Sequence, residues 1–357
     1  MYSWPEYLER MSDHHHHLVA HGFVPSAETA GQRVFTREQT MRYPEPFTTA
    51  AYVARRTAEF MREITDRPWM ALAHFYEPHP PFRSPFGGLH DPSTIEAGPN
   101  FRRMPDANLS LVNRQRAADV NGKVLEDMDL STEAGWRQIR AYYWGLMKLV
   151  DNQVGVMLDA LGASGQADRT VVIFTSDHGE MLGDHNQYGK HVMFEESVKI
   201  LLLVYDPRVQ NAPERIGGRF SQVDLVPTML ELLDQPVPSH VHGFGRAAAL
   251  RDQGSLDGDD VFIEWQDTDL NLPGFVDAGP AFVAMQAAPR RTIVGHEGWK
   301  LTLYEADDHE LFDLNHDPHE HTNALAEDSN RPIAENLRGR IVAWQARVAD
   351  TVELPDL

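Results

Sequence analysis

The chain has 357 residues, of which 42% are apolar and 24% charged, a composition that excludes disorder as its main state. Its 53 acidic and 32 basic residues give a formal charge of −21, which disfavours binding to nucleic acid or to a membrane surface. Cysteine is absent, so disulfides, thiolate metal sites and a cysteine nucleophile are excluded. The longest apolar run, residues 200–205, is too short to span a bilayer, and the N-terminus lacks the pattern of a signal peptide. We therefore expect a cytoplasmic protein.

The first third of the chain predicts few regular elements. Residues 1–46 have weak periodicity and predict mostly loop with short helices. A threonine at position 48 or 49 is a typical helix N-cap, and apolar residues at helical spacing follow it up to Asp66. Residues 69–75 predict a short buried strand that the proline-rich residues 77–81 cannot continue. Residues 83–130 are rich in turn formers and predict a long surface excursion.

The remainder alternates helices and strands. Thr132 is a predicted N-cap, the apolar face of the following helix runs from Trp136 to Leu161, and Gly162 would end that helix. The apolar run 170–175 is typical of a strand buried on both faces of a parallel sheet. The later predicted elements are strands at 199–204 and 261–265, a short helix opened by Pro227, three short strands at 291–294, 299–304 and 310–314, and a helix with an apolar face over 333–348.

This order predicts an α/β fold with a mostly parallel sheet flanked by helices and a smaller C-terminal α+β subdomain. We place the α/β domain at residues 1–285, and the C-terminal antiparallel sheet with its helix at residues 286–357.

The first candidate site is Asp177-His178, directly after the buried strand 170–175. The carboxyl end of a strand is where ligands bind in open parallel sheets, and a carboxylate next to an imidazole can face one cation. Gly179 would let another backbone segment approach closely. An aspartate in a turn beside a surface histidine is the structural alternative.

Two further residues are candidates for binding or catalysis. Lys190 follows Gly189 in a polar loop, where a compact positive charge suits a bound anion, although a solvated lysine is the simpler interpretation. His79 lies in a stiff Pro-His-Pro-Pro loop and could act as a general acid or contact an ester oxygen. A structural histidine explains it equally well. The histidines at 14–17, and those at 309, 316, 319 and 321, are interpreted as exposed surface residues.

Taken in order, these motifs resemble the sulfatase family of the alkaline phosphatase superfamily, in particular bacterial arylsulfatases, choline-sulfatases and phosphonate monoester hydrolases. The resemblance rests on residues 175–185, Gly189-Lys190 and residues 194–197, and it extends to the histidine loop at 78–82. Further matching stretches are the helix residues 141–155, Asp224 to Thr228, and residues 310–323. The resemblance implies an alkaline phosphatase-like fold for most of the chain.

The resemblance also implies roles. Asp177 and His178 would be ligands of one divalent metal ion, with calcium, manganese or magnesium suited to an oxygen and nitrogen site. Lys190 would bridge the oxygens of a small anionic ester, and His79 would donate a proton or contact the leaving group. In this family the nucleophile is a formylglycine made from Cys or Ser in a Cys/Ser-x-Pro-x-Arg motif, whose hydrated form attacks sulfur or phosphorus.

The sequence departs from the family at this point, because it has no cysteine and no Ser-x-Pro-x-Arg motif. An N-terminal strand with two further acidic metal ligands is also not found. We therefore expect a hydrolase of sulfate esters or phosphonate or phosphate monoesters in truncated form, with little activity alone. The alternative is a non-catalytic sulfatase remnant, or one half of a split enzyme that needs an N-terminal fragment. A homo-oligomer is a further expectation, since a missing strand would leave an open sheet edge. Two-zinc phosphoesterases also use Asp-His-Gly, but their other ligands are not recognisable here.

Overall fold

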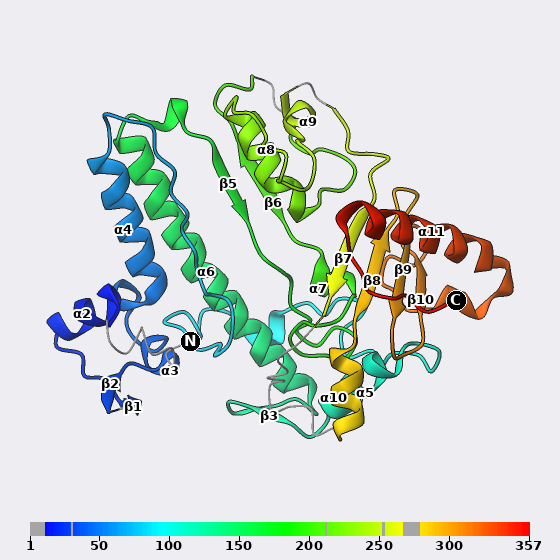
Figure 1. Ribbon diagram of the computed structural model, residues 1–357. Coiled ribbons are helices and arrows are strands. Elements are labelled where there is room, and N and C mark those ends of the chain that lie inside the picture. Colours follow the sequence, from blue (N-terminus) through cyan, green and yellow to red (C-terminus); the bar gives the residue numbers. More distant parts are fainter. Residues whose placement is uncertain (1–10, 30, 211–212, 252–253, 267–278) are drawn as a thin grey trace. The chain divides into compact units, whose positions relative to one another are not determined.

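The computed structural model describes residues 11–29, 31–210, 213–251, 254–266 and 279–357 (Figure 1). Its internal contacts divide the chain into two units. The first comprises residues 1–96 and 124–170, and the second comprises residues 97–123 and 171–357. None of the described helices combines the length and the apolar character needed to cross a membrane.

The first unit is built around two long helices that pack against each other, α4 and α6. Thr48 caps α4 by accepting a hydrogen bond from the backbone N–H of Ala51 at 3.2 Å, and Thr132 caps α6 in the same way through Gly135 at 3.0 Å, as predicted. The elements of this unit are α2 (Asp13–Ala20), β1 (Ala27–Thr29), β2 (Gln32–Val34), α3 (Arg37–Thr40), α4 (Thr49–Glu63), β3 (Val124–Leu125), β4 (Met128–Asp129), α6 (Glu133–Ala163), and the 3-10 turns η1 (Glu45–Phe47), η2 (Pro92–Thr94) and η3 (Ala167–Arg169).

Two predictions for the first unit are wrong. The histidine run at 14–17 is not an exposed loop but part of α2, which begins where the Ser12 side chain accepts from the N–H of His15, and its rings pack on Phe47 and Tyr52. Residues 69–75 form neither a strand nor a helix. A β-strand needs a hydrogen-bonding neighbour, and these residues have none among the described strands. Their apolar side chains are not buried either: Met70 is 65% and Leu72 70% exposed.

The second unit contains the pair β5 (Val172–Thr175) and β6 (Leu202–Tyr205). They are antiparallel, with Val172 opposite Tyr205 and Thr175 opposite Leu202. The prediction of parallel strands buried on both faces is therefore wrong for these two runs. Their pairing is antiparallel, no residue of β5 is fully buried, and Leu203 and Tyr205 of β6 are exposed. An apolar, β-branched run favours a strand but determines neither the direction of its neighbour nor what covers its faces. One face of the pair contacts an apolar cluster from the helices α8 (Leu225–Leu232) and α9 (Ala247–Arg251).

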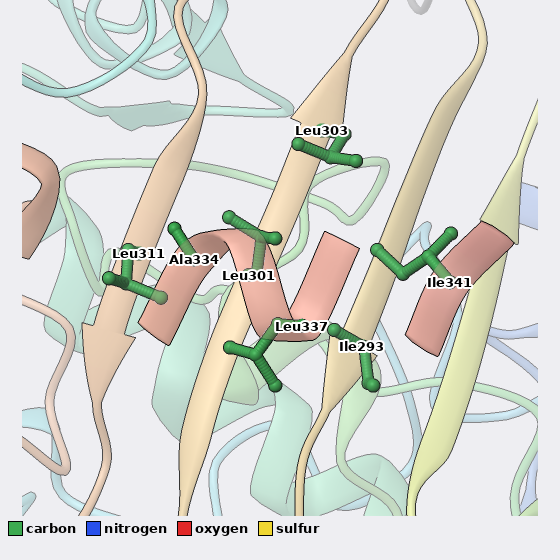
Figure 2. Packing of buried hydrophobic residues seen from close by; sticks show 7 residues of the cluster. All are labelled: Ile293, Leu301, Leu303, Leu311, Ala334, Leu337 and Ile341. Atoms are coloured by element: carbon green, nitrogen blue, oxygen red, sulfur yellow. The ribbon is translucent and has the colours of Figure 1, made fainter. Parts of the chain in front are cut away.

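The C-terminal part forms a four-stranded antiparallel sheet in the order β10-β9-β8-β7. Its strands are β7 (Val261–Trp265), β8 (Arg290–Val294), β9 (Trp299–Tyr304) and β10 (Glu310–Asp313). The helix α11 (Arg331–Val348) covers this sheet, and Figure 2 shows Leu337 and Ile341 of the helix packed over Ile293 and Leu301 of the strands. This confirms the predicted small C-terminal sheet with its helix, and the sheet also includes β7, which was predicted as a strand outside it.

The predicted surface excursion 83–130 contains one element that matters for the site. Residues 111–119 form the helix α5 (Leu111–Asp119), on which Val112 and Arg116 are buried. Ser110 caps this helix through the N–H of Asn113 at 3.4 Å. Turn-forming residues around a short amphipathic stretch concealed it in the sequence. The other elements of this unit are α7 (Glu195–Val198), α10 (Pro280–Ala287), and the 3-10 turns η4 (Gln222–Asp224), η5 (Ala324–Ala326) and η6 (Asp328–Asn330).

Candidate metal and anion site

Asp177 and His178 follow β5 at its carboxyl end, the position predicted for them, although β5 belongs to an antiparallel pair and not to the parallel sheet of the prediction. The side chain of Asp177 is 86% exposed and that of His178 is 39% exposed. Asp177 Oδ1 accepts the backbone N–H of His178 at 3.0 Å, which leaves Oδ2 turned toward the imidazole, 3.5 Å from His178 Nε2. His178 Nδ1 lies 2.8 Å from the carbonyl of Gly179. With Nδ1 as the donor of that bond, Nε2 carries the lone pair that a cation requires.

Backbone contacts fix this turn in place. Gly179 donates its N–H to the carbonyl of Ser197 at 2.8 Å, and a Cβ at this position would lie 2.0 Å from the carbonyl oxygen of Glu196. Only glycine fits, as the sequence suggested. From the other side, Gln222 Nε2 donates to the carbonyls of Ser176 and Asp177, both at 3.0 Å. Sequence reasoning missed Gln222, since a lone glutamine before a helix carries no signal of its own.

The pair fits one divalent cation. Two ligand atoms that each lie about 2.3–2.6 Å from a calcium ion are separated by roughly 3–4 Å, and the 3.5 Å between Oδ2 and Nε2 falls within that range. A carboxylate oxygen with an imidazole nitrogen suits calcium, manganese or magnesium better than a thiolate-seeking ion. Two protein ligands are fewer than the six to eight that calcium usually takes, so this pair alone would bind a cation weakly.

Lys190 lies close enough to this pair for their charges to interact. Burial lowers the pKa of Lys190, and the nearby carboxylates of Glu180 and Asp177 partly oppose that shift. Burial raises the pKa of Glu180, whose Oε1 is buried without a hydrogen-bond partner. Within the second unit, Lys190 therefore interacts electrostatically with Asp177 and with Glu180. Sequence reasoning overlooked Glu180, although it follows the Asp-His-Gly motif directly.

His79 belongs to the first unit, where its loop is tightly held. Its carbonyl accepts from Arg37 Nη2 at 2.7 Å, its N–H donates to Tyr76, and its Nδ1 lies 3.0 Å from the carbonyl of Pro80. The Tyr76 ring stacks at a tilt, 4.6 Å away, and carries the Arg37 guanidinium 3.5 Å above its centre. The ring of His79 is thus oriented by its own loop. Its role at an ester stays a prediction.

A second group of potential metal ligands lies at one end of the C-terminal sheet, just before β7 and in the turn between β8 and β9. There Asp260, His296 and Glu297 bring one ligand atom each within 4.8 Å of one another. Arg340 already occupies this group: it donates to Asp260 through Nε at 2.8 Å and to Glu297 through Nη1 at 2.6 Å. A guanidinium in the centre of the cluster neutralises the carboxylates that would attract a cation, so we assign it no metal.

Comparison with known proteins finds matches in sequence. The family model named Sulfatase matches residues 13–235, and the model described as N-sulphoglucosamine sulphohydrolase, C-terminal, matches residues 183–347. The chain is 26% identical to the multifunctional alkaline phosphatase superfamily protein PehA of Trinickia caryophylli, over 88% of this chain and 62% of that protein. It is also 26% identical to arylsulfatase K of Xenopus laevis, over 85% of this chain and 56% of that protein.

The fold agrees with a solved structure as well. The phosphonate monoester hydrolase of Agrobacterium radiobacter superposes with a TM-score of 0.70 at 26% identity, over 96% of this chain and 67% of that one. The predicted alkaline phosphatase-like fold is thereby confirmed. The chain spans less than two thirds of the length of the two curated relatives.

Proposed function

Because this chain belongs to the sulfatase family, we propose that it supplies the metal and anion site of a hydrolase acting on sulfate esters or phosphonate or phosphate monoesters. The observation that carries the proposal is the Asp177-His178 pair, with its ligand atoms 3.5 Å apart, beside the half-buried Lys190. A cation and a lysine held together form a receptor for a small anionic ester.

Each residue has a proposed task. Asp177 and His178 would hold one divalent cation, which when bound withdraws charge from the oxygens of the substrate. Lys190 would contact the same anionic group as it gains negative charge, and His79 would donate a proton to the leaving oxygen. The attacking group of the family, a formylglycine, has no Cys or Ser motif to arise from in these 357 residues. We propose that little turnover occurs without a segment that provides it.

The first test concerns metal affinity. We expect calorimetric titration of the chain with calcium or manganese to give weak binding, with a dissociation constant well above micromolar, because two ligands form an incomplete set. Asp177→Ala should remove this binding, whereas Asp151→Ala, which removes an exposed carboxylate that pairs with Lys148 on α6, should leave it unchanged. Tight stoichiometric binding that depends on Asp177 would contradict the expectation of an incomplete site.

A surface of the second unit suggests how the missing segment would attach. On β6, Leu203 is 62% and Tyr205 57% exposed, and Leu201 just before the strand is 42% exposed. These alternate residues form one apolar sheet face, and β5 has β6 as its one ladder partner among the described strands. An open edge and an apolar face invite association. We propose that they receive a complementing N-terminal segment, or a second copy of the chain when that segment is absent.

The test of the function is a reconstitution. The chain alone should be oligomeric or aggregation-prone and should not hydrolyse an aryl sulfate or a phosphonate ester at an enzyme-like rate. Addition of a separately expressed N-terminal segment of a sulfatase relative, with its formylglycine and acidic pair, should increase both solubility and turnover. Lys190→Ala should then lower kcat by about 10²–10³, the usual effect of losing one group that stabilises transition-state charge.

Two controls make the reconstitution decisive. Leu203→Lys should prevent complementation by placing a charge on the apolar face, while Lys148→Ala on the exposed side of α6 should not. A monomeric chain that turns over substrate unaided through Lys190 would contradict the proposed need for a complementing segment. If the reconstituted pair binds stably but remains inactive, the alternative of a non-catalytic remnant is favoured, which the absent nucleophile motif also suggests.

A further inference from the structure

The backbone around Lys190 has its carbonyl groups held one after another. Arg116 Nη2, on α5, donates to the carbonyl of Tyr188 at 3.1 Å and to that of Lys190 at 2.7 Å. Between them, the carbonyl of Gly189 accepts the N–H of Met181 at 2.8 Å. The Arg116 guanidinium thus bridges the two residues on either side of Gly189. Gly189 itself is bound by Met181, which follows the Asp-His-Gly motif in the chain.

The next carbonyl along the loop is held from the C-terminal part of the chain. His191 O accepts from Gln286 Nε2 at 3.1 Å and from Arg290 Nη1 at 3.4 Å. Arg290 is itself fixed by donating to the carbonyl of Gln286 at 2.7 Å. The four consecutive carbonyls of residues 188–191 therefore all accept hydrogen bonds. The donors lie on α5, on α10 and on β8, and the donor to Gly189 lies in the loop that follows the Asp-His-Gly motif.

These donors are buried, and the loop that they hold is bent. Arg116 is 8% exposed, Arg290 1% and Gln286 0%. Gly189 has φ 80° and His191 has φ 78°, a conformation that a non-glycine residue adopts only when its surroundings enforce it. Two guanidinium groups out of water are costly unless their hydrogen bonds are satisfied. Arg116 bonds to residues 187, 188 and 190 of the loop through Nε and Nη2. Arg290 bonds to the carbonyls of His191 and Gln286, while its Nε is buried without a partner.

We propose that Arg116 and Arg290 are positioning residues for Lys190: they fix the loop backbone so that the ammonium group is delivered to the anion site without a search over loop conformations. This inference rests on the proposed function, since it takes Lys190 as the anion ligand. It gives the C-terminal sheet, which contributes Arg290 at the start of β8, a part in building the site. Preorganised charge binds an anion more tightly than a mobile lysine does, because no ordering cost is paid on binding.

The test uses the 357-residue chain and inorganic sulfate as the probe, with affinity measured by NMR titration. Arg116→Met and Arg290→Met should each raise the sulfate dissociation constant on the order of tenfold. They should also speed amide hydrogen exchange in residues 187–192 by tenfold or more. The matched control is Arg291→Met. The Arg291 side chain pairs with Asp350 at 2.7 and 2.9 Å and donates to the carbonyls of Trp265 and Arg290, but none of these bonds reaches residues 188–191. This control should lower stability while leaving sulfate affinity and loop exchange unchanged.

Lysine variants separate geometry from charge. Arg116→Lys and Arg290→Lys keep the charge and are the variants to use where methionine prevents folding. The shorter lysine side chain places its one nitrogen about one bond short of Nη, and it lacks the second donor nitrogen through which Arg116 also reaches Gln187 and Arg290 reaches Gln286. We expect them to recover only part of the affinity and to leave the loop exchange fast. Wild-type affinity and exchange in both lysine variants would overturn the inference, because charge alone would then suffice.

Lys190→Ala distinguishes the inference from the function beneath it. If this variant loses sulfate binding while the arginine variants bind like the wild type, the positioning role is wrong and the proposed anion site stands. If Lys190→Ala binds sulfate as well as the wild type, the anion site itself is wrong, and the arginines have no ligand to position. The expected result is that sulfate affinity falls in Lys190→Ala and in the arginine variants, and that it is unchanged in Arg291→Met.

Discussion

Lys300→Met is expected to destabilise the chain by about 3–5 kcal/mol at pH 8, the usual cost of leaving a buried charge without its partner. Lys300, on β9, is 0% exposed, and its Nζ lies 3.0 Å from Glu195 Oε1 and 2.8 Å from Glu320 Oε1. Glu320 also accepts the backbone N–H of Glu195 at 2.6 Å, so the three residues join the start of α7 to the C-terminal sheet. Without the ammonium group, the buried carboxyl of Glu320 would face the partly exposed carboxyl of Glu195 with no positive charge between them.

The pH dependence of this variant follows from Glu320. Burial, together with the charge of Glu195, raises the pKa of Glu320 to about 7. A raised folded-state pKa means that the folded chain keeps a proton that the unfolded chain releases above pH 4.5, so the contribution of Glu320 to stability falls as pH rises toward 7. The loss in free energy of unfolding caused by Lys300→Met should therefore be smaller at pH 5, where Glu320 is protonated, than at pH 8.

Urea unfolding of the wild type and of three variants tests this. The double variant Lys300→Met/Glu320→Gln should regain part of the lost stability, since it removes one stranded carboxyl. Lys148→Met is the surface control: Lys148 pairs with Asp151 at 3.1 Å, both side chains are exposed, and its loss should cost less than about 0.5 kcal/mol. Equal free energies of unfolding for Lys300→Met and the wild type at pH 8 would mean that the buried network contributes nothing.

Periodicity and capping predicted the long elements well. The helix α6 begins after Thr132, and α4 begins after Thr48, because both depend on a local side-chain bond. The end of α6 was less well predicted: Gly162 lies inside the helix, and Gly165, with φ 68°, is the glycine in the left-handed conformation. The strand predicted at residues 69–75 does not form for a different reason, because strand formation depends on a partner elsewhere in the chain.

The candidate site was predictable only in part. Asp177 and His178 are adjacent in sequence, so their pairing required no knowledge of the tertiary structure, and Gly179 marked the close approach of another backbone segment. Arg116 and Arg290 could not be found in this way. They lie 74 and 100 residues from Lys190 in sequence, and a buried arginine looks like any surface arginine until its carbonyl partners are known.

Acidification is expected to destabilise the fold through His185, a residue to which sequence reasoning gave no role of its own. Its ring is 1% exposed and stacks on Phe194 with centroids 3.8 Å apart, and its backbone N–H donates to Asn100 at 2.9 Å. Burial, reinforced by the positive charges of neighbouring groups, lowers the pKa of His185 to about 3. The folded chain therefore keeps this imidazole neutral where the unfolded chain would protonate it.

His185 affects the free energy of unfolding only at acidic pH. Above pH 6.5 the imidazole is neutral in both states and does not affect stability. Between pH 6.5 and about 3 the unfolded state alone binds the proton, and stability falls by at most about 1.4 kcal/mol per pH unit. Glu320 has the opposite effect on stability in part of this pH range, so the pH dependence of the wild type alone does not reveal the contribution of His185. The difference between the wild type and His185→Gln isolates it, because Glu320 is common to both.

We expect the wild type to be the more stable of the two at pH 7.5, since glutamine cannot stack on Phe194 as an aromatic ring does. This advantage should shrink by about 3 kcal/mol on going to pH 4.5, as the unfolded wild type gains a proton that glutamine cannot take. Thermal unfolding at several pH values between these limits measures it. His316→Gln, a change at an 86% exposed side chain, should track the wild type throughout. A wild-type advantage over His185→Gln that stays constant across the range would mean that His185 is protonated in the folded chain as readily as in the unfolded one, and its burial would then not control its charge.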